Sequence, residues 1–180
     1  YAVDLRSVTT AASTTAIRIG PVPRINEAQF ATSTTYLATH QVGTVVQLEL
    51  GGINAHPFHL HVNSFQLQTD PPDGTYGGYF ESGDWHDVLL LPVDNNLNVR
   101  QQTDSFTGKQ VLHCHILEHE DQGMMAVMNI AGTEGTLYSN AENLDNTCYR
   151  SAFNAATHAP SISVASTCSY TDSPPSPSMP

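Results

Sequence analysis

Apolar positions recur at short, alternating intervals through the middle of the chain. Val45, Leu48 and Leu50 mark one such run, which ends at a pair of glycines, and residues 56–68 alternate largely between apolar and polar types. Three further short apolar runs cover 88–93, 111–115 and 125–130. Turn-forming residues separate these runs, most densely at 70–78, and no long helical period is present. This pattern predicts an all-β fold, an antiparallel sandwich or barrel built from short strands.

The segments on either side of this pattern are more polar. Residues 1–35 are rich in Ser, Thr and Ala, so we expect an incomplete lead-in to the sandwich there. Residues 36–135 are the predicted main domain. An irregular extension over 136–171 and a Pro/Ser-rich tail over 172–180 are expected to follow. Because the chain starts without Met and without a signal-like segment, we interpret it as a processed product or a fragment of something longer.

Length and charge narrow the functional classes. The chain has 180 residues, enough to bury a core of its own. Six basic against seventeen acidic residues give a formal net charge of −11. A surface of this sign repels phosphate backbones, so no nucleic-acid partner is expected. No stretch approaches the roughly 18–20 continuous apolar residues of a membrane-spanning helix, so no membrane span is expected.

One of the three cysteines lies among the histidines, and the other two lie near the C-terminus. Cys114 stands between two histidines, whereas Cys148 and Cys168 lie in the polar C-terminal stretch. We pair the latter two as a disulfide, which would close a loop of about 20 residues and contribute roughly 3 kcal/mol in the chain-entropy model. Two free thiols are the open alternative. A disulfide, a single lysine and high acidity together favour a secreted or extracytoplasmic protein.

Most of the histidines gather in two clusters. Of nine histidines, seven fall between His56 and His119. Residues 56–61 have the sequence HPFHLH, and residues 113–119 have the sequence HCHILEH, followed by GMM at 123–125. Because side chains alternate along a strand, the two histidines on either side of Cys114 share one face and the cysteine faces the other way. Such a strand could join two metal centres through covalent bonds.

The ligand types indicate which metal such a site would hold. One thiolate, two imidazoles and a weak thioether are typical of a blue copper site. Zinc is the rival, because a cysteine and two histidines also hold zinc. Zinc, however, has no particular use for a methionine at the fourth position or for histidines flanking the cysteine. The two clusters together therefore favour copper.

These two segments resemble the C-terminal copper motifs of the multicopper oxidases, the family of laccases, ascorbate oxidase, bilirubin oxidase and ferroxidases. The resemblance runs from about His40 to Ala131 and includes GDWHD at 83–87 and FTGK at 106–109. It implies a cupredoxin-like Greek-key β-sandwich with an irregular C-terminal extension, standing at the C-terminal end of a multi-domain enzyme.

The resemblance also implies a role for each candidate ligand. The type 1 copper ligands would be His56, Cys114, His119 and the axial Met124. The type 2 copper would be bound by His59, and the paired type 3 coppers by His61, His113 and His115. In the family, a reductant gives electrons near the His119 position, and four of them pass through the Cys114 position to dioxygen. His119 and Cys114 are therefore the candidate catalytic residues.

The chain departs from the family pattern in two ways. The family's trinuclear cluster takes eight histidines, of which this chain offers four, so half of the type 2 and type 3 site is missing. We expect the other half from an N-terminal cupredoxin domain in the same protein, with a second chain as the alternative. The sequence also has His61-Val62-Asn63 where many laccases have H-G-H.

The resemblance predicts a laccase-like oxidase of phenols or aromatic amines, with copper as cofactor and dioxygen as the second substrate. A metallo-oxidase acting on Fe(II) or Mn(II) is an alternative, because acidic side chains surround the His119 position and could attract cations: Glu118, Glu120 and Asp121. A stand-alone type 1 copper electron-transfer domain and a non-redox zinc or copper domain are the further alternatives.

The remaining candidates have structural interpretations. We expect His40 and His158 to be exposed and His86 to be a structural histidine. Asp84 and Asp87 could orient metal ligands or could be ordinary turn carboxylates. The methionines at 125 and 128 are expected to be core residues.

Overall fold

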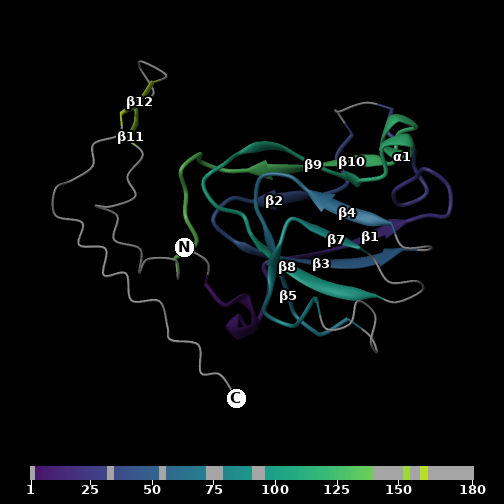
Figure 1. Cartoon of the computed structure of the whole chain (residues 1–180). Helices are drawn as coiled ribbons and strands as arrows, with labels where there is room; N and C mark the ends of the chain where they lie inside the picture. Colours follow the sequence, from purple (N-terminus) through teal and green to yellow (C-terminus); the bar gives the residue numbers. More distant parts are fainter. Residues whose placement is uncertain are drawn as a thin grey trace. The chain divides into compact units, whose positions relative to one another are not determined.

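A computed structural model describes most of the chain up to residue 139 and two short strands beyond it (Figure 1). The described residues are 3–31, 35–52, 56–71, 79–90, 96–139, 152–154 and 159–161. The chain divides into two units, Ala2–Ala141 and a smaller one of Tyr1 with Glu142–Pro180. Cys148, Cys168 and His158 lie outside the described residues, so the predicted disulfide stays a prediction.

The larger unit consists of two five-stranded sheets, which confirms the predicted all-β sandwich. The first sheet has the order β1(Ser13–Ile19), β3(Val45–Gly52), β8(Leu97–Gln102), β5(Phe65–Leu67), β6(Trp85–His86). The second has the order β2(Thr39–Gln41), β10(Met125–Ala131), β9(Gly108–Cys114), β4(Pro57–Leu60), β7(Val88–Leu90). Pairing is antiparallel except at one edge of each sheet, where β1 runs parallel to β3 and β2 parallel to β10. Chain neighbours such as β3 and β4 therefore belong to different sheets, as in a Greek-key sandwich.

Two short helices and a two-stranded sheet complete the described structure. The 3₁₀ helix η1 covers Leu5–Ser7, and the α-helix α1 covers Leu117–Asp121 directly after β9 (Figure 1). In the smaller unit, β11(Ala152–Asn154) pairs antiparallel with β12(Ala159–Ser161). No helix in the described part of the chain is long and apolar enough to cross a membrane.

The core lies between the two sheets and accounts for the alternating pattern in the sequence. β3 alternates between buried and partly exposed residues along most of its length, and β4 does so throughout. The rings of Phe58 on β4 and Phe65 on β5 lie 5.8 Å apart between their centroids and join the sheets. Cys114, Met124 and Met128 belong to the same buried cluster. One candidate thiolate ligand thus sits in the core, at the end of its strand.

Residues 3–31 take part in the sandwich more than the sequence pattern suggests. β1 is an edge strand of the first sheet and pairs with β3 over its full length. The 3₁₀ helix packs through Leu5, which is fully buried and whose N–H donates to the Gln66 side chain at 2.7 Å. Arg100 on β8 donates to the Leu5 carbonyl at 2.8 Å. The polar residues of this segment are those on the outer face of an edge strand, which the pattern alone does not distinguish from a loop.

His40 is buried, which corrects the expectation that it is exposed. Only 3% of it is accessible, and its ring nitrogens lie 2.9 Å from Ser13 Oγ and 3.4 Å from Thr15 Oγ1. These contacts join β2 at the edge of the second sheet to β1 at the edge of the first. Because burial disfavours the charged form, the pKa of His40 is lowered.

Replacing His40 by Gln is expected to make the protein less sensitive to acid. A His with a lowered pKa in the folded state binds fewer protons than in the unfolded state. Its contribution to stability is therefore full above the unfolded value of about 6.5 and is lost as the pH falls below it. The free energy of unfolding, measured with denaturant between pH 7.5 and 5, should fall less steeply in the variant than in the wild-type protein. Parallel slopes would contradict this account.

Candidate metal centres

Two groups of metal-ligating side chains lie on opposite faces of β9 and β4. The pairing places Phe58 opposite Cys114 and His59 opposite His113. Alternation then directs Cys114 into the sandwich and His113 to the outer face, as the sequence predicts. The two groups of side chains whose ligand atoms lie within 4.8 Å of one another are His56, Cys114 and His119, and His59, His61 and His113. We call them the thiolate group and the histidine group.

The thiolate group is compact and largely buried. Cys114 is fully buried and His56 is 3% exposed. The Sγ atom of Cys114 lies 3.5 Å from His56 Nδ1 and 3.8 Å from His119 Nδ1. One sulfur and two imidazole nitrogens therefore converge on a small volume in the core, with only weak sulfur hydrogen bonds between them. This donor set fits a soft or borderline metal ion.

A tight chain reversal brings His119 and Met124 back to Cys114. His119 lies on α1, and its carbonyl accepts the Met124 N–H at 2.9 Å, while the Met124 carbonyl accepts the Cys114 N–H at 3.1 Å. Met124 is fully buried and shares the core cluster of Cys114. Gly123 makes the reversal possible, because its φ is 91° and a Cβ there would lie 2.9 Å from Gln29 Cγ. The short helix α1 and the turn at Gly123 thus determine how many residues separate Cys114, His119 and Met124.

Burial disfavours the charged forms of Cys114 and His56 while no cation is bound. Burial raises the pKa of the Cys114 thiol, and the carboxylate of Glu120 adds to that shift, while the backbone of Ile116 opposes it. Burial lowers the pKa of His56, the charge of His119 adds to the effect, and the carbonyl of Gly20 partly opposes it. A bound cation would compensate the negative charge of the thiolate, so metal binding and loss of the thiol proton are coupled.

The histidine group lies on the outer face of the second sheet and is more open. His61 is exposed and His59 is half-buried, whereas His113 is 5% exposed. The Nε2 atoms of His61 and His113 lie 3.0 Å apart. The exposed ring of His115 lies beside them, with its centroid 5.4 Å from that of His59 and 5.6 Å from that of His113. Burial lowers the pKa of His61, with smaller effects of the charges of its neighbours.

Backbone carbonyls and one carboxylate fix the tautomers of two of these histidines. The Nδ1 of His59 lies 3.0 Å from the Asp87 carbonyl, and the Nδ1 of His113 lies 3.1 Å from the Cys114 carbonyl. Because a carbonyl only accepts, Nδ1 must carry the proton in both rings. The Glu120 carboxylate, 3.3 Å from His113 Nδ1, favours the same tautomer. The Nε2 lone pair of His59 is thus left available for a metal ion, whereas that of His113 points at the Nε2 of His61.

The structure brings together most of the residues singled out from the sequence and shows the contacts of three others. Glu120, one of the acidic side chains expected around His119, contacts His113 of the histidine group. Asp87 reaches His59 through its backbone carbonyl rather than its carboxylate. The Asp84 carboxylate lies 3.9 Å from His86 Nε2, which has no hydrogen-bond partner among the described residues.

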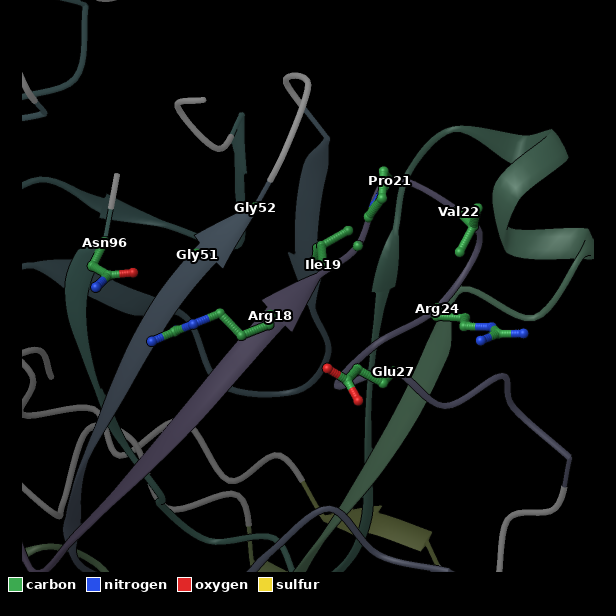
Figure 2. A pocket seen from close by; sticks show the side chains of 10 residues that line it. Arg18, Ile19, Pro21, Val22, Arg24, Glu27, Gly51, Gly52 and Asn96 are labelled. Carbon is green, nitrogen blue, oxygen red and sulfur yellow. The ribbon is translucent and has the colours of Figure 1, made fainter. Parts of the chain in front are cut away.

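A cavity of about 440 Å³ opens near the thiolate group, at the ends of β1 and β3 (Figure 2). Its lining includes Gly20, whose carbonyl acts on His56, and the neighbouring Val22, which is 50% exposed. Arg18 extends toward Asn96 in Figure 2. This volume is within the range of small-molecule sites.

Comparisons with known proteins agree with this geometry. A sequence model of a family described as multicopper oxidase matches residues 3–133. Bilirubin oxidase of Albifimbria verrucaria is 37% identical over 120 residues, which cover 62% of this chain and 20% of that protein. A laccase of Bacillus subtilis (strain 168) is 30% identical over 115 residues, which cover 55% of this chain and 22% of that protein. The chain thus spans about a fifth of the length of these curated relatives.

Solved structures confirm the predicted cupredoxin-like sandwich. A laccase from Pediococcus acidilactici superimposes with a TM-score of 0.60 at 27% sequence identity, over 73% of this chain and 30% of that one. A multicopper oxidase from Campylobacter jejuni, described as a metallo-oxidase, has a TM-score of 0.57 over 67% of this chain and 30% of that one. At 22% identity, the second comparison concerns the fold alone.

Replacing Glu120 by Gln is expected to weaken Cu(II) binding by the histidine group about tenfold, because the carboxylate beside His113 is lost. Loss of a hydrogen-bond partner of a metal-binding histidine typically lowers metal affinity by about tenfold or more. The effect stays small because the Cys114 carbonyl still accepts the His113 proton. A Cu(II) titration followed by electron paramagnetic resonance measures it. Glu118→Gln is the matched control, since Glu118 is exposed and its carboxylate accepts a hydrogen bond from the Gln122 side chain. An equal loss in both variants would argue against the contact with His113.

Proposed function

Because this chain belongs to the multicopper oxidase family, we propose that it is the C-terminal cupredoxin domain of a laccase-like oxidase. That enzyme couples the one-electron oxidation of phenols or aromatic amines to the four-electron reduction of dioxygen to water. The observation that supports this most is the position of Cys114, the last residue of β9, between His113 and His115. The strand directs Cys114 to the thiolate group on one face and His113 to the histidine group on the other.

Copper fits both groups in this proposal. The type 1 copper would be held by His56, Cys114, His119 and Met124, the type 2 copper by His59, and the type 3 coppers by His61, His113 and His115. Copper bound in these places would supply one-electron redox chemistry between the reductant and dioxygen. The convergence of one sulfur and two Nδ1 atoms, and the available Nε2 lone pair of His59 on the outer face, support this assignment.

In this proposal the residues of the chain bind the metal ions, shield the thiolate group from water and connect the two groups. Cys114 and His56 are withdrawn from water, so the thiolate group is shielded from other oxidants. His113, Cys114 and His115 are consecutive, so the two groups are linked through peptide units without any intervening side-chain contact. His119, which is only partly buried, is the ligand through which a reductant at the surface would approach. His119 and Cys114 are thus the proposed catalytic residues.

The histidine group is half of a trinuclear site in this proposal. The family resemblance implies eight histidines, and this chain supplies His59, His61, His113 and His115. The exposure of His61 and His115 supports an arrangement in which a second surface completes the site. We propose an N-terminal cupredoxin domain of the same protein as that surface, with a second chain as the alternative.

The cavity beside Gly20 favours an organic reductant over a metal ion. A volume of about 440 Å³ accommodates an aromatic molecule, and Val22 and Pro21 supply apolar lining. The metallo-oxidase alternative depends on the exposed carboxylates Glu118 and Asp121 next to His119. The electron-transfer alternative has no use for the histidine group. A secreted or extracytoplasmic location with the Cys148–Cys168 disulfide is also part of the proposal.

Replacing Cys114 by Ser is expected to abolish the intense blue absorption of the copper-loaded protein and, in the complete enzyme, oxygen consumption. The absorption depends on the thiolate, whereas the exposed histidine group keeps its own ligands. Absorption spectroscopy and an oxygen electrode measure the two effects. A blue wild-type protein whose complete form consumes no oxygen would support the electron-transfer alternative. A copper-loaded wild-type protein without blue colour would refute both redox functions.

Replacing Val22 by Trp is expected to raise the KM for phenolic reductants about tenfold, because the larger side chain fills the cavity, and tenfold corresponds to about 1.4 kcal/mol of lost binding. Steady-state kinetics of the complete enzyme should show no such change with Fe(II), which does not need the cavity. Leu137→Trp is the control, since Leu137 is exposed and lies near Gly43, at the other end of β3. A larger effect on Fe(II) than on phenols would favour the metallo-oxidase.

A further inference from the structure

Two glutamines form a buried amide pair inside the sandwich. Gln101 on β8 and Gln110 on β9 are 0% and 1% exposed. Each side-chain NH₂ donates to the other's oxygen, Gln101 to Gln110 at 3.2 Å and Gln110 to Gln101 at 2.9 Å. The pair therefore bridges the two sheets. Since burying amides is costly and their mutual hydrogen bonds only offset that cost, two apolar side chains of similar size would stabilise the core equally well.

Gln110 also forms a hydrogen bond to the backbone of the histidine group. The second N–H of the Gln110 amide donates to the carbonyl of His61 at 2.9 Å, so both its protons are used. The ladder between β4 and β9 ends at the pair of Leu60 and Leu112, and the Val111 carbonyl accepts the His61 N–H. Gln110 is the next residue of β9, opposite the position where β4 would continue beyond His61. Its side chain thus takes the place of the missing strand partner.

The chain turns sharply at this point, in a conformation that a β-branched residue disfavours. Val62 has a φ of 74°, and the Asn63 N–H donates to the His61 carbonyl at 3.1 Å. A three-residue turn with a positive φ is strained, most of all for a β-branched residue, and persists only where its surroundings enforce it. Asn63 is held in turn by the Asp104 carbonyl, which accepts its side-chain amide at 3.3 Å.

The ring of His61 is positioned by two neighbouring rings and by its own backbone. His61 is exposed, its ring centroid lies 4.7 Å from that of His59 and 5.1 Å from that of the buried His113, and its Nε2 lies 3.0 Å from the His113 Nε2. Because part of the ring is open to solvent, the backbone at His61 contributes to where the ring points. That backbone is fixed by the β9 ladder through Val111 on one side and by Gln110 on the other.

We propose that the Gln101–Gln110 pair is a positioning device for His61: it anchors the His61 carbonyl, enforces the strained turn at Val62 and so aims the exposed imidazole at His113. The inference deepens the proposed function, since it assigns residues that hold a ligand of the histidine group. Its geometric part concerns the metal-free chain and does not depend on copper.

The first variant is Gln110→Met, which keeps the size of the side chain and removes the anchor. In the metal-free protein, we expect the nuclear Overhauser contact between the rings of His61 and His113 to disappear. In a Cu(II) titration followed by electron paramagnetic resonance, we expect about tenfold weaker binding by the histidine group, while the blue absorption of the thiolate group stays unchanged.

The double variant Gln101→Met/Gln110→Met separates positioning from stability. It leaves no unpaired buried amide, so it should unfold at a denaturant concentration near that of the wild-type protein. Its Cu(II) affinity and its ring contact should stay as impaired as in Gln110→Met. Gln66→Met is the matched control, because Gln66 is 3% exposed, lies on β5 of the other sheet, and bonds Leu5 and Gly83. This control should lose stability without losing the ring contact.

The proposal is overturned if the double variant keeps the contact between the rings and wild-type Cu(II) affinity, or if Gln66→Met loses them equally. A wild-type histidine group that binds no Cu(II) would refute the proposed function. In that case the ring contact alone, present in the wild-type protein and absent in the double variant, would still support the positioning role, and its retention would overturn it.

Discussion

The alternation of side chains along β9 is the constraint on which the rest of the site depends. A strand directs consecutive residues to opposite faces, so His113, Cys114 and His115 cannot all serve one ion. The outcome is a sulfur in the dry core, next to Met124, and imidazoles on an outer face. The separation of Cys114 and His113 is then set by covalent geometry. Core packing and any metal binding are consequently coupled, because Cys114 is a candidate ligand and a core residue at once.

The sequence predicts the parts of the site that follow from this local geometry. The opposite directions of Cys114 and its flanking histidines were predicted because a period of two needs no tertiary information, whereas the membership of His56 and His119 in the thiolate group followed from the family resemblance. α1 was not predicted, since five residues are too few for a helical period, and the contact of Glu120 with His113 therefore had no sequence signal. β8 was missed for another reason. Its last residues are polar yet buried, and Gln101 is suited to the core only through its partner on another sheet.

The two groups differ in what holds them in place. The thiolate group is fixed by the backbone hydrogen bonds around Met124 and by the close approach at Gly123. The histidine group has an open face, and its geometry is maintained from below, through the carbonyls of Asp87 and Cys114 and the side chain of Gln110. Hydrogen bonds from buried polar groups thus hold the histidine group in place, whereas core packing holds the thiolate group.

The open histidine face has a practical consequence for handling this chain by itself. His61 and His115 are exposed, and His59 has its Nε2 lone pair turned outward by the Asp87 carbonyl. Neutral imidazoles so close together are good ligands for nickel and zinc as well as copper. We therefore expect an immobilised nickel column to retain the chain without an added affinity tag. Traces of zinc in ordinary buffers would compete with copper for the same histidines.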